Sequence, residues 1–446
     1  MSENHLITER RKKIEAWNEK GFDGYAKKYD RTHTAAEAKM ACKTAKLREA
    51  NEILEKPAGA ENSICGRIMQ KREMGKLAFL KIRDVSGDFQ VCFAKNVLGD
   101  DFKFFTKKLD LGDFIGVAGE FFVTKHGEPT LMAIEVTPLA KTIRPMPEKF
   151  HGITDTESCY RERNLDLMTN PETFDRFQKR SHVVREIRDF FHEKEFVEVE
   201  TPILNAQAGG AMAKTFNTHH NALDSEFVLR IALELDQKRI VGGGLERVFE
   251  IGRCFRNEGI DPSHLQEFTS IEWYCAYDTL QNHEEWIEEL FHRIAERVFG
   301  KKVFQILDKD EKFVDVDLAQ KFGRVTFAEL LKKHAKIDMF NISDEDLRKE
   351  AKKLGIEDVD NRGRGNLLDD IYKQTARPLL IQPTFVVDWP SDLKPLARPN
   401  GDGTSDVSQL LIAGWEITNG YGELIDPVVQ RQLLEDQQKA KNAGDD

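Results

Sequence analysis

The chain has 446 residues, of which 32% are charged and 40% are hydrophobic, and its net charge is −11. This composition is typical of a globular protein and excludes a largely disordered chain. No run of eighteen apolar residues occurs, and the first residues lack the apolar core of a signal peptide. We therefore expect a cytoplasmic protein of about three domains that makes no use of a membrane.

The six cysteines are scattered along the chain, and neither a CxxC pair nor an HExxH motif occurs. We therefore expect no zinc ribbon and no redox dithiol. The acidic net charge argues weakly against a general nucleic-acid coat protein, although a local basic surface suffices for RNA binding.

Residues 1–58 are predicted to form a basic helical leader, since the first fifty hold twelve Lys and Arg against eight Asp and Glu. Helices are expected over 5–20 and 34–56. Thr34 is a suitable N-cap for the second helix, and Pro57 follows its end.

Residues 59–140 change to short alternating runs separated by glycine turns, which is typical of β-strands. Five strands are expected, with a helix near 100–110 between the third and the fourth. This order fits a small OB-type barrel, a fold that often binds single-stranded nucleic acid. The expected strands cover residues 64–69, 77–84, 89–95, 114–123 and 130–137.

Residues 141–172 contain three prolines and are predicted to be a linker, and 173–446 a larger second domain. The overall expectation is an α+β protein in which the OB barrel precedes an antiparallel sheet flanked by helices. In the second domain we expect helices over 172–196 and 282–299, strands over 197–204, 247–258, 267–277, 384–390 and 410–424, and a helical insertion near 307–375.

The predicted hairpin of residues 247–277 carries side chains that suit a nucleotide. Arg256 ends its first strand and can hold a phosphate through its guanidinium group. Phe268 on the returning strand can stack on a base. Taken alone, this pattern fits surface ion pairing by Arg256 and Glu258 better.

Five spaced motifs, which follow one another along the chain in the order of a known family, strengthen the nucleotide interpretation. They are KFHGITD with YRERNLDL at 149–167, FVEVETPIL at 196–204, RIALELDQKRIVGGGLERVFEIG at 230–252, RCFRNEGIDPSHLQEFTSIEWY at 253–274, and GWEITNGYGELIDP at 414–427. Together they resemble the class II aminoacyl-tRNA synthetases, and within that class the lysyl-tRNA synthetases. The resemblance implies ATP-dependent activation of L-lysine and its transfer to the 3′ end of tRNA(Lys).

The same resemblance implies a pocket for lysine. Glu423 would pair with the ε-ammonium group and Tyr274 would hydrogen-bond it. Glu234 and the backbone around Gly210 would hold the α-amino group. The remaining members of the implied pocket, Asn419 and Tyr421, would lie beside the lysine side chain. Buried carboxylates suit this task because an ammonium ion must be neutralised when it leaves water.

For ATP, the resemblance implies that Arg256 contacts the α-phosphate and Phe268 stacks on adenine. Glu258 and His264 would complete the catalytic loop of this hairpin. Glu416 and Glu423 would hold Mg²⁺ against the phosphates, since this hard cation prefers oxygen ligands.

On the barrel, the resemblance implies an anticodon-binding face. Phe79, Gln90 and Glu128 match positions that recognise a uridine, and Arg67 is a further candidate. From the residues alone, Phe79 fits the barrel core equally well, and a surface salt bridge would explain Arg67.

Two departures and one assembly prediction complete the resemblance. No GxGxDR-like third signature occurs, so the chain is expected to be a C-terminally incomplete synthetase. Glu195 stands at a predicted surface turn where the family usually has glycine. The resemblance also implies a homodimer. The apolar stripe at its expected interface, which fits the chain's own core equally well, is Val184, Ile187, Phe190 and Phe191.

Two alternatives stay open at this point. One is an aspartate- or asparagine-tRNA ligase of the same subclass, although its pocket should present Lys or Arg rather than Glu423. The other is a catalytically incomplete paralogue or fragment that acts as a tRNA-binding module.

Overall fold

A computed structural model describes residues 3–146, 153–211, 213–261 and 264–442. The chain divides into two compact units, Met1–Phe174 and Asp175–Asp446. None of the described helices combines the length and the hydropathy that crossing a bilayer requires.

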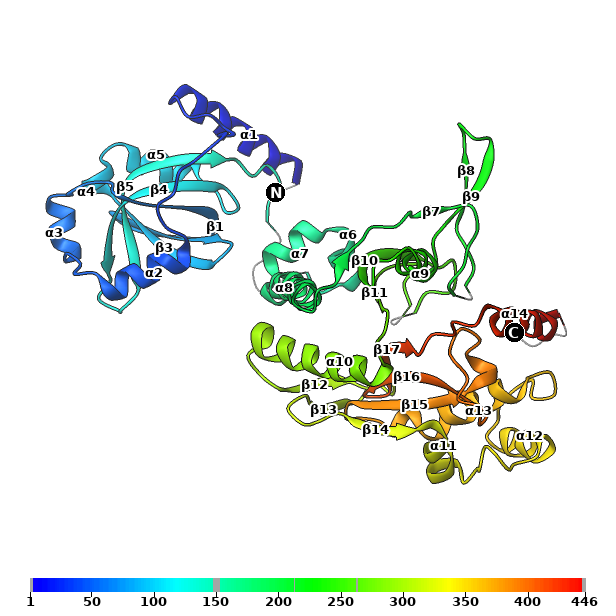
Figure 1. Cartoon of the computed structure of the whole chain (residues 1–446). Helices are drawn as coiled ribbons and strands as arrows, with labels where there is room; N and C mark the ends of the chain where they lie inside the picture. Colours follow the sequence, from blue (N-terminus) through cyan, green and yellow to red (C-terminus); the bar gives the residue numbers. More distant parts are fainter. Residues whose placement is uncertain (1–2, 147–152, 212, 262–263, 443–446) are drawn as a thin grey trace. The chain divides into compact units, whose positions relative to one another are not determined.

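The first unit is built on a closed five-stranded barrel, which confirms the predicted OB-type fold (Figure 1). The strands run in the order β1-β2-β3-β5-β4, and a short helical segment separates the third from the fourth. The barrel strands are β1 (Asn62–Met74), β2 (Leu77–Asp84), β3 (Gly87–Ala94), β4 (Phe114–Val123) and β5 (Pro129–Ala140). The helices of this unit are α1 (Glu3–Glu19), α2 (Ala35–Thr44), α3 (Ala50–Glu55), α4 (Lys95–Leu98), α5 (Asp101–Lys108), α6 (Thr156–Arg161) and α7 (Arg163–Thr169).

The single helix expected over 34–56 is wrong, because two helices, α2 and α3, occupy this stretch. Thr34 caps α2 with a complete capping box, as its sequence position predicts. Arg48, between the two helices, donates to Glu120 of β4 and to the carbonyls of Glu52 and Lys56. These tertiary contacts outweigh the helical propensity of the connecting residues.

A buried ion pair fastens the start of the chain to the barrel. The Lys141 ammonium has no exposed side-chain surface and lies 2.6 Å from carboxylate oxygens of both Asp113 and Asp110. Its Nζ also lies 5.3 Å from the centre of the buried Trp17 ring of α1. Burial raises the pKa of Asp113, which shows how strongly this carboxylate depends on its partners.

We expect Lys141→Met to destabilise the barrel unit by about 3–5 kcal/mol, because it leaves a buried carboxylate without its cation. Urea unfolding followed by circular dichroism should show the barrel transition at lower urea. Lys28→Met is a matched control, since this lysine is 76% exposed. Equal unfolding of both variants would contradict the assigned role of Lys141.

The second unit carries two sheets around which its helices pack. The first sheet has the order β11-β10-β6 and the second β14-β15-β16-β17. Their strands are β6 (Val197–Glu198), β10 (Arg247–Phe255), β11 (Glu267–Cys275), β14 (Gly323–Thr326), β15 (Thr384–Pro390), β16 (Thr404–Ile412) and β17 (Trp415–Tyr421). Two smaller sheets comprise β7 (Leu204–Asn205), β8 (Asn217–His220) and β9 (Ser225–Leu229), and β12 (Val303–Leu307) with β13 (Phe313–Asp317).

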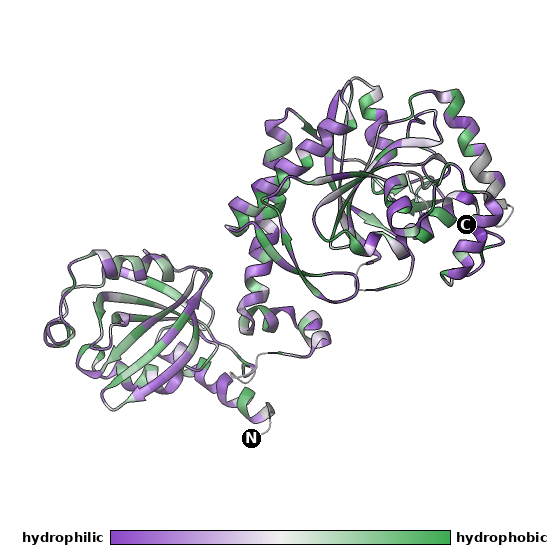
Figure 2. Cartoon of the chain, turned by 90° about the horizontal axis from the view of Figure 1, so that it is seen from below, coloured by the Kyte–Doolittle hydropathy of each residue, from purple (hydrophilic) through white to green (hydrophobic). Residues whose placement is uncertain are grey.

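The α-helices of the second unit lie around these sheets, and Figure 2 shows apolar stretches along the strands of both units. They are α8 (Pro171–Glu193), α9 (Glu234–Gly242), α10 (Leu280–Ile294), α11 (Phe327–Leu330), α12 (Asp344–Lys353), α13 (Arg364–Thr375) and α14 (Pro427–Asn442). Short π- and 3₁₀-helical turns cover Ala295–Phe299, Leu331–Ala335, Arg377–Leu379 and Ser391–Leu393.

The hairpin expected over 247–277 is confirmed, since β10 and β11 pair antiparallel from Arg247↔Cys275 to Phe255↔Glu267. Three other expectations for this unit need correction. The segment 197–204 is not one strand, because β6 ends at Glu198 and β7 begins at Leu204. The stretch 307–375 is not helical at its start, because β13 pairs with β12 and β14 joins the main sheet beside β15. The segment 410–424 is not one strand: it turns at Ala413 and Gly414, where φ is positive, between β16 and β17.

Most of the apolar stripe on α8 faces the core of its own unit. Phe190 and Phe191 are 1% and 2% exposed and pack with Phe196 and Phe249, and Ile187 lies against the same cluster. At the end of α8, Glu195 has φ of 62°, a conformation that glycine adopts without strain. This positive φ explains why glycine, rather than the Glu195 of this chain, is usual at the position in the family.

Candidate amino-acid and nucleotide site

An acidic pocket forms where α9, β11 and the end of β17 meet. Glu234 is the first residue of α9 and is only 6% exposed. Glu272 of β11 accepts a hydrogen bond from the Leu233 backbone N–H at 3.1 Å and one from the Tyr274 hydroxyl at 3.3 Å. These bonds fix the start of α9 against β11, so two carboxylates and a phenol share one half-buried space.

Gly210 lies directly beside Glu234. A Cβ atom built on Gly210 would lie 3.0 Å from the Glu234 Cβ and 3.1 Å from the Ala232 Cβ, and φ of Gly210 is +82°. A larger residue would therefore be strained and would crowd the carboxylate. The structure thus brings together the two residues that were predicted to hold the α-amino group.

Lys238 supplies a cation inside this acidic pocket. Its Nζ lies 2.6 Å from Glu234 Oε1, one helical turn earlier, and 2.7 Å from Glu423 Oε2. The same Nζ lies 5.8 Å from the centre of the Tyr274 ring. The ammonium group of Lys238 therefore links the two carboxylates that were predicted to hold opposite ends of the amino acid.

The crowding of carboxylates makes their charges costly. Burial raises the pKa of Glu423 to about 7, although Lys238 acts in the opposite direction. Burial likewise raises the pKa values of Glu272 and Tyr274. Burial opposes the charge on Lys238, yet Glu423 and Glu234 raise its pKa overall. Because burial penalises these negative charges, the carboxyl groups favour a proton or a cation as partner.

Asn419 and Tyr421 line β17 next to the pocket. The Asn419 amide donates to the Tyr421 hydroxyl at 3.0 Å, and Gln409 of β16 donates to Asn419 at 3.4 Å. Burial raises the pKa of Tyr421 to about 12, so its hydroxyl keeps its proton at neutral pH. The hydroxyl of Tyr421 therefore has a protein partner.

The hairpin presents the predicted nucleotide residues at the end where a loop connects its two strands. Arg256 directly follows β10, its Nε donates to the Ile231 carbonyl at 3.3 Å, and its guanidinium carbon lies 5.2 Å from the Phe268 ring centre. An arginine and an aromatic ring are therefore side by side, as the recognition of a phosphate and a base requires.

Glu258 and His264 lie in the loop beyond this pair. Glu258 Oε1 accepts from the Lys214 N–H at 3.4 Å. The His264 ring lies 2.6 Å from a carboxylate oxygen of Asp261, and its side chain is 71% exposed. Glu258 is therefore hydrogen-bonded to the backbone of Lys214, and Asp261 orients the ring of His264.

The predicted magnesium ligands lie on and just after β17. Glu416 is near the start of this strand, and Glu423 follows its end by two residues. Burial raises the pKa of Tyr421, and the charges of Glu416 and Glu423 both add to this shift, so both carboxylates act on the same hydroxyl. Their assignment to Mg²⁺ stays a prediction.

The outer face of the barrel carries Phe79. Its neighbours Ala78 and Leu80 point into the barrel core, whereas Phe79 packs with Cys92 in a separate cluster under α3. The residue is half-buried, so the register places it outside the barrel interior. This excludes the barrel core as the position of Phe79.

The other barrel candidates have protein partners. Gln90 donates to the Thr130 hydroxyl at 2.9 Å, and the Glu128 N–H donates to the Thr124 hydroxyl at 3.1 Å. Arg67 donates to the Gly112 carbonyl at 3.1 Å and lies 4.2 Å from the Phe114 ring centre. Arg67 is thus held by a carbonyl and a ring.

Sequence reasoning missed Lys238 and Glu272 as members of the pocket. Both carried a spacing signal. Lys238 follows Glu234 by four residues, which places both side chains on one helix face. Glu272 precedes Tyr274 by two residues, which places both on one face of a strand.

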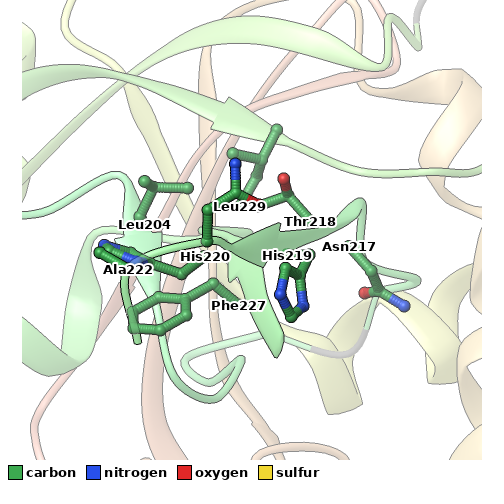
Figure 3. A pocket seen from close by; sticks show the side chains of 9 residues that line it. Leu204, Asn217, Thr218, His219, His220, Ala222, Phe227 and Leu229 are labelled. Atoms are coloured by element: carbon green, nitrogen blue, oxygen red, sulfur yellow. The ribbon is translucent and has the colours of Figure 1, made fainter. Parts of the chain in front are cut away.

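A hollow on the β7-β9-β8 sheet contains none of the predicted site residues (Figure 3). It is lined by Leu204, residues 217–222, Phe227 and Leu229.

A group of three potential metal ligands also lies outside the predicted sites. Cys275, Asp278 and His283 place potential ligand atoms within 4.8 Å of one another. However, His283 Nδ1 accepts a hydrogen bond from the Trp273 indole N–H at 3.1 Å. The other ring nitrogen therefore carries the proton and cannot bind a metal.

An OB barrel followed by an antiparallel domain with an arginine–aromatic hairpin and an acidic pocket defines the architecture of a class II synthetase. Residues 155–446 match the family model described as tRNA synthetases class II (D, K and N), and residues 63–139 match the OB-fold nucleic acid binding domain. The chain belongs to this class II tRNA synthetase family.

The names of individual proteins that resemble the chain are more specific than the description of the family model. A lysine–tRNA ligase of Enterococcus faecalis is 40% identical over 99% of this chain and 88% of its own length. Lysine–tRNA ligases of Staphylococcus saprophyticus and Lactococcus lactis are 40% and 39% identical over the same shares. These similarities do not favour an aspartate- or asparagine-tRNA ligase or a mere tRNA-binding module.

Proposed function

We propose that this protein is a lysine–tRNA ligase that activates L-lysine with ATP and transfers it to tRNA(Lys). The observation that carries the proposal is the cluster in which Glu234 and Glu423 pair with a single cation, while Glu272 bonds the neighbouring Tyr274 hydroxyl. Such a pocket suits an amino acid with two ammonium groups. An aspartate side chain would instead meet like charges, which disfavours it.

The chemistry needs positioning more than acid–base catalysis. The lysine carboxylate attacks the α-phosphorus of ATP, a mixed anhydride forms, and pyrophosphate leaves with its electron pair. The 3′-hydroxyl of the tRNA then attacks the activated carbonyl and AMP leaves. Arg256 is proposed to neutralise the α-phosphate, and Phe268 to stack on adenine, so that the reacting atoms are aligned.

Glu258 and His264 are proposed to border the phosphates, and Glu416 to border the ATP site. Mg²⁺ is a proposed companion of ATP that would reduce the charge of its phosphates. Glu416 and Glu423 are proposed to hold this ion through their carboxylate oxygens. Gly210, Glu234, Tyr274, Asn419, Tyr421 and Glu423 are the proposed lysine site.

The OB barrel is proposed to bind the anticodon through Phe79, Gln90, Glu128 and Arg67. Its outward position supports stacking of Phe79 on a base. A homodimer remains a proposal that rests on family resemblance, because most of the α8 stripe faces its own core. The cytoplasm, where tRNA is charged, is the proposed location.

We expect Phe79→Ala to weaken tRNA(Lys) binding by about 1–3 kcal/mol, since stacking on one base contributes about that much. Filter binding at fixed salt measures the effect. Val85→Ala is a matched control because Val85 is a 58% exposed apolar residue of the same barrel. Unchanged affinity in a folded Phe79 variant would remove this residue from the RNA face.

The proposed function as a whole is tested by charging tRNA with labelled L-lysine. We expect ATP-dependent accumulation of lysyl-tRNA. Binding of tRNA without any charging would instead support the tRNA-binding module.

A further inference from the structure

The side chain of Lys238 has the same end group as the proposed substrate. Its ammonium lies 2.6 Å from Glu234 and 2.7 Å from Glu423, the carboxylates proposed for the α-amino and ε-ammonium groups. We propose that Lys238 is an internal ammonium that pairs with Glu423 before L-lysine binds, and that the ε-ammonium of L-lysine displaces it from this carboxylate. This inference rests on the proposed function.

The two contacts of Nζ differ in where the carboxylates are attached. Nζ donates a hydrogen bond to Glu234 across one turn of α9, so both partners belong to the same helix. Glu423 lies beyond the end of β17 and reaches Nζ at 2.7 Å from a different element. The bond to Glu234 can therefore persist while Glu423 changes partner.

The side chain of Lys238 has room to move. It is 26% exposed, whereas Glu234 is 8% exposed. A lysine can keep its apolar stem in place while its ammonium turns toward water. Two ammonium groups held by the two oxygens of one half-buried carboxylate would lie close together and repel each other strongly. The ε-ammonium of the substrate and Nζ therefore compete for Glu423.

With competition, the apparent affinity for L-lysine equals the intrinsic affinity multiplied by the fraction of molecules in which Lys238 has left Glu423. Removing the internal cation should then make binding tighter, which is the reverse of the usual effect of removing a pocket residue. If Lys238 were instead a fixed part of the binding surface, its removal would weaken binding.

The test is isothermal titration of the full chain with L-lysine, comparing the wild type with Lys238→Met and Lys238→Arg. We expect Lys238→Met to bind about tenfold more tightly, and Lys238→Arg, which keeps a cation, to stay within about threefold of the wild type. Arg239→Met is the control. It removes a 76% exposed cation from the next position, where Arg239 pairs with Asp236, and should leave lysine affinity unchanged.

Thermal unfolding of each variant identifies loss of fold. If Lys238→Met does not fold, Lys238→Gln, which also removes the cation but keeps a polar side chain, replaces it with the same expected tightening. Equal or weaker binding by folded Lys238→Met, with binding by the wild type intact, would overturn the displacement inference and leave the proposed function standing. Absence of L-lysine binding in the wild type and in every variant would overturn both. Binding by Lys238→Met alone would support displacement.

Discussion

Glu423→Gln is expected to reduce kcat/KM for L-lysine by about 10²–10³-fold in lysine-dependent pyrophosphate exchange. The substitution keeps the shape of the side chain but removes the charge that pairs with an ammonium, and charged hydrogen bonds of this kind are worth about 3–5 kcal/mol when one partner is lost.

Glu345→Gln is the matched control for that substitution. Glu345 lies on α12 and is 82% exposed, so the loss of its charge should leave lysine activation unaltered. An unchanged kcat/KM for lysine in folded Glu423→Gln would remove Glu423 from the substrate site.

Arg256→Ala is expected to lower kcat/KM for ATP by about 10²-fold or more, because the developing charge on the α-phosphate loses its guanidinium partner. Exchange kinetics at varied ATP measure this effect, and lysine binding should remain. The Nε bond to Ile231 and the neighbouring Phe268 ring orient the guanidinium in advance. A lysine at this position would lack the planar fork and should restore only part of the activity.

Arg253→Ala provides the control on the same hairpin. Arg253 is 53% exposed and pairs with Glu267 at 3.1 Å, a surface contact of small energetic value. Similar losses in the Arg253 and Arg256 variants would point to a general disturbance of the hairpin and contradict a phosphate role for Arg256.

The architecture could be predicted largely from sequence because its signals are local. Glycine turns and alternating runs indicated the barrel, and the spacing of the two segments around Arg256 indicated the β10–β11 hairpin, which the register confirms. The two helices in 34–56 could not be separated in this way, because Arg48 binds Glu120, a residue far along the chain.

The candidate site was predicted less completely, for two physical reasons. Motif matching named carboxylates that a ligand would touch, but it gave no information about Lys238, whose role depends on Glu423 arriving from a distant strand. Phe79 depended on strand register, which only the barrel pairing resolves.

The central claim is that the acidic pocket selects lysine, and amino-acid-dependent exchange of pyrophosphate into ATP tests it most directly. The full chain should be assayed with L-lysine, L-aspartate and L-asparagine under identical conditions. Stimulation by L-lysine alone is the result we predict. Stimulation by L-aspartate or L-asparagine in its place would contradict the assignment of this pocket.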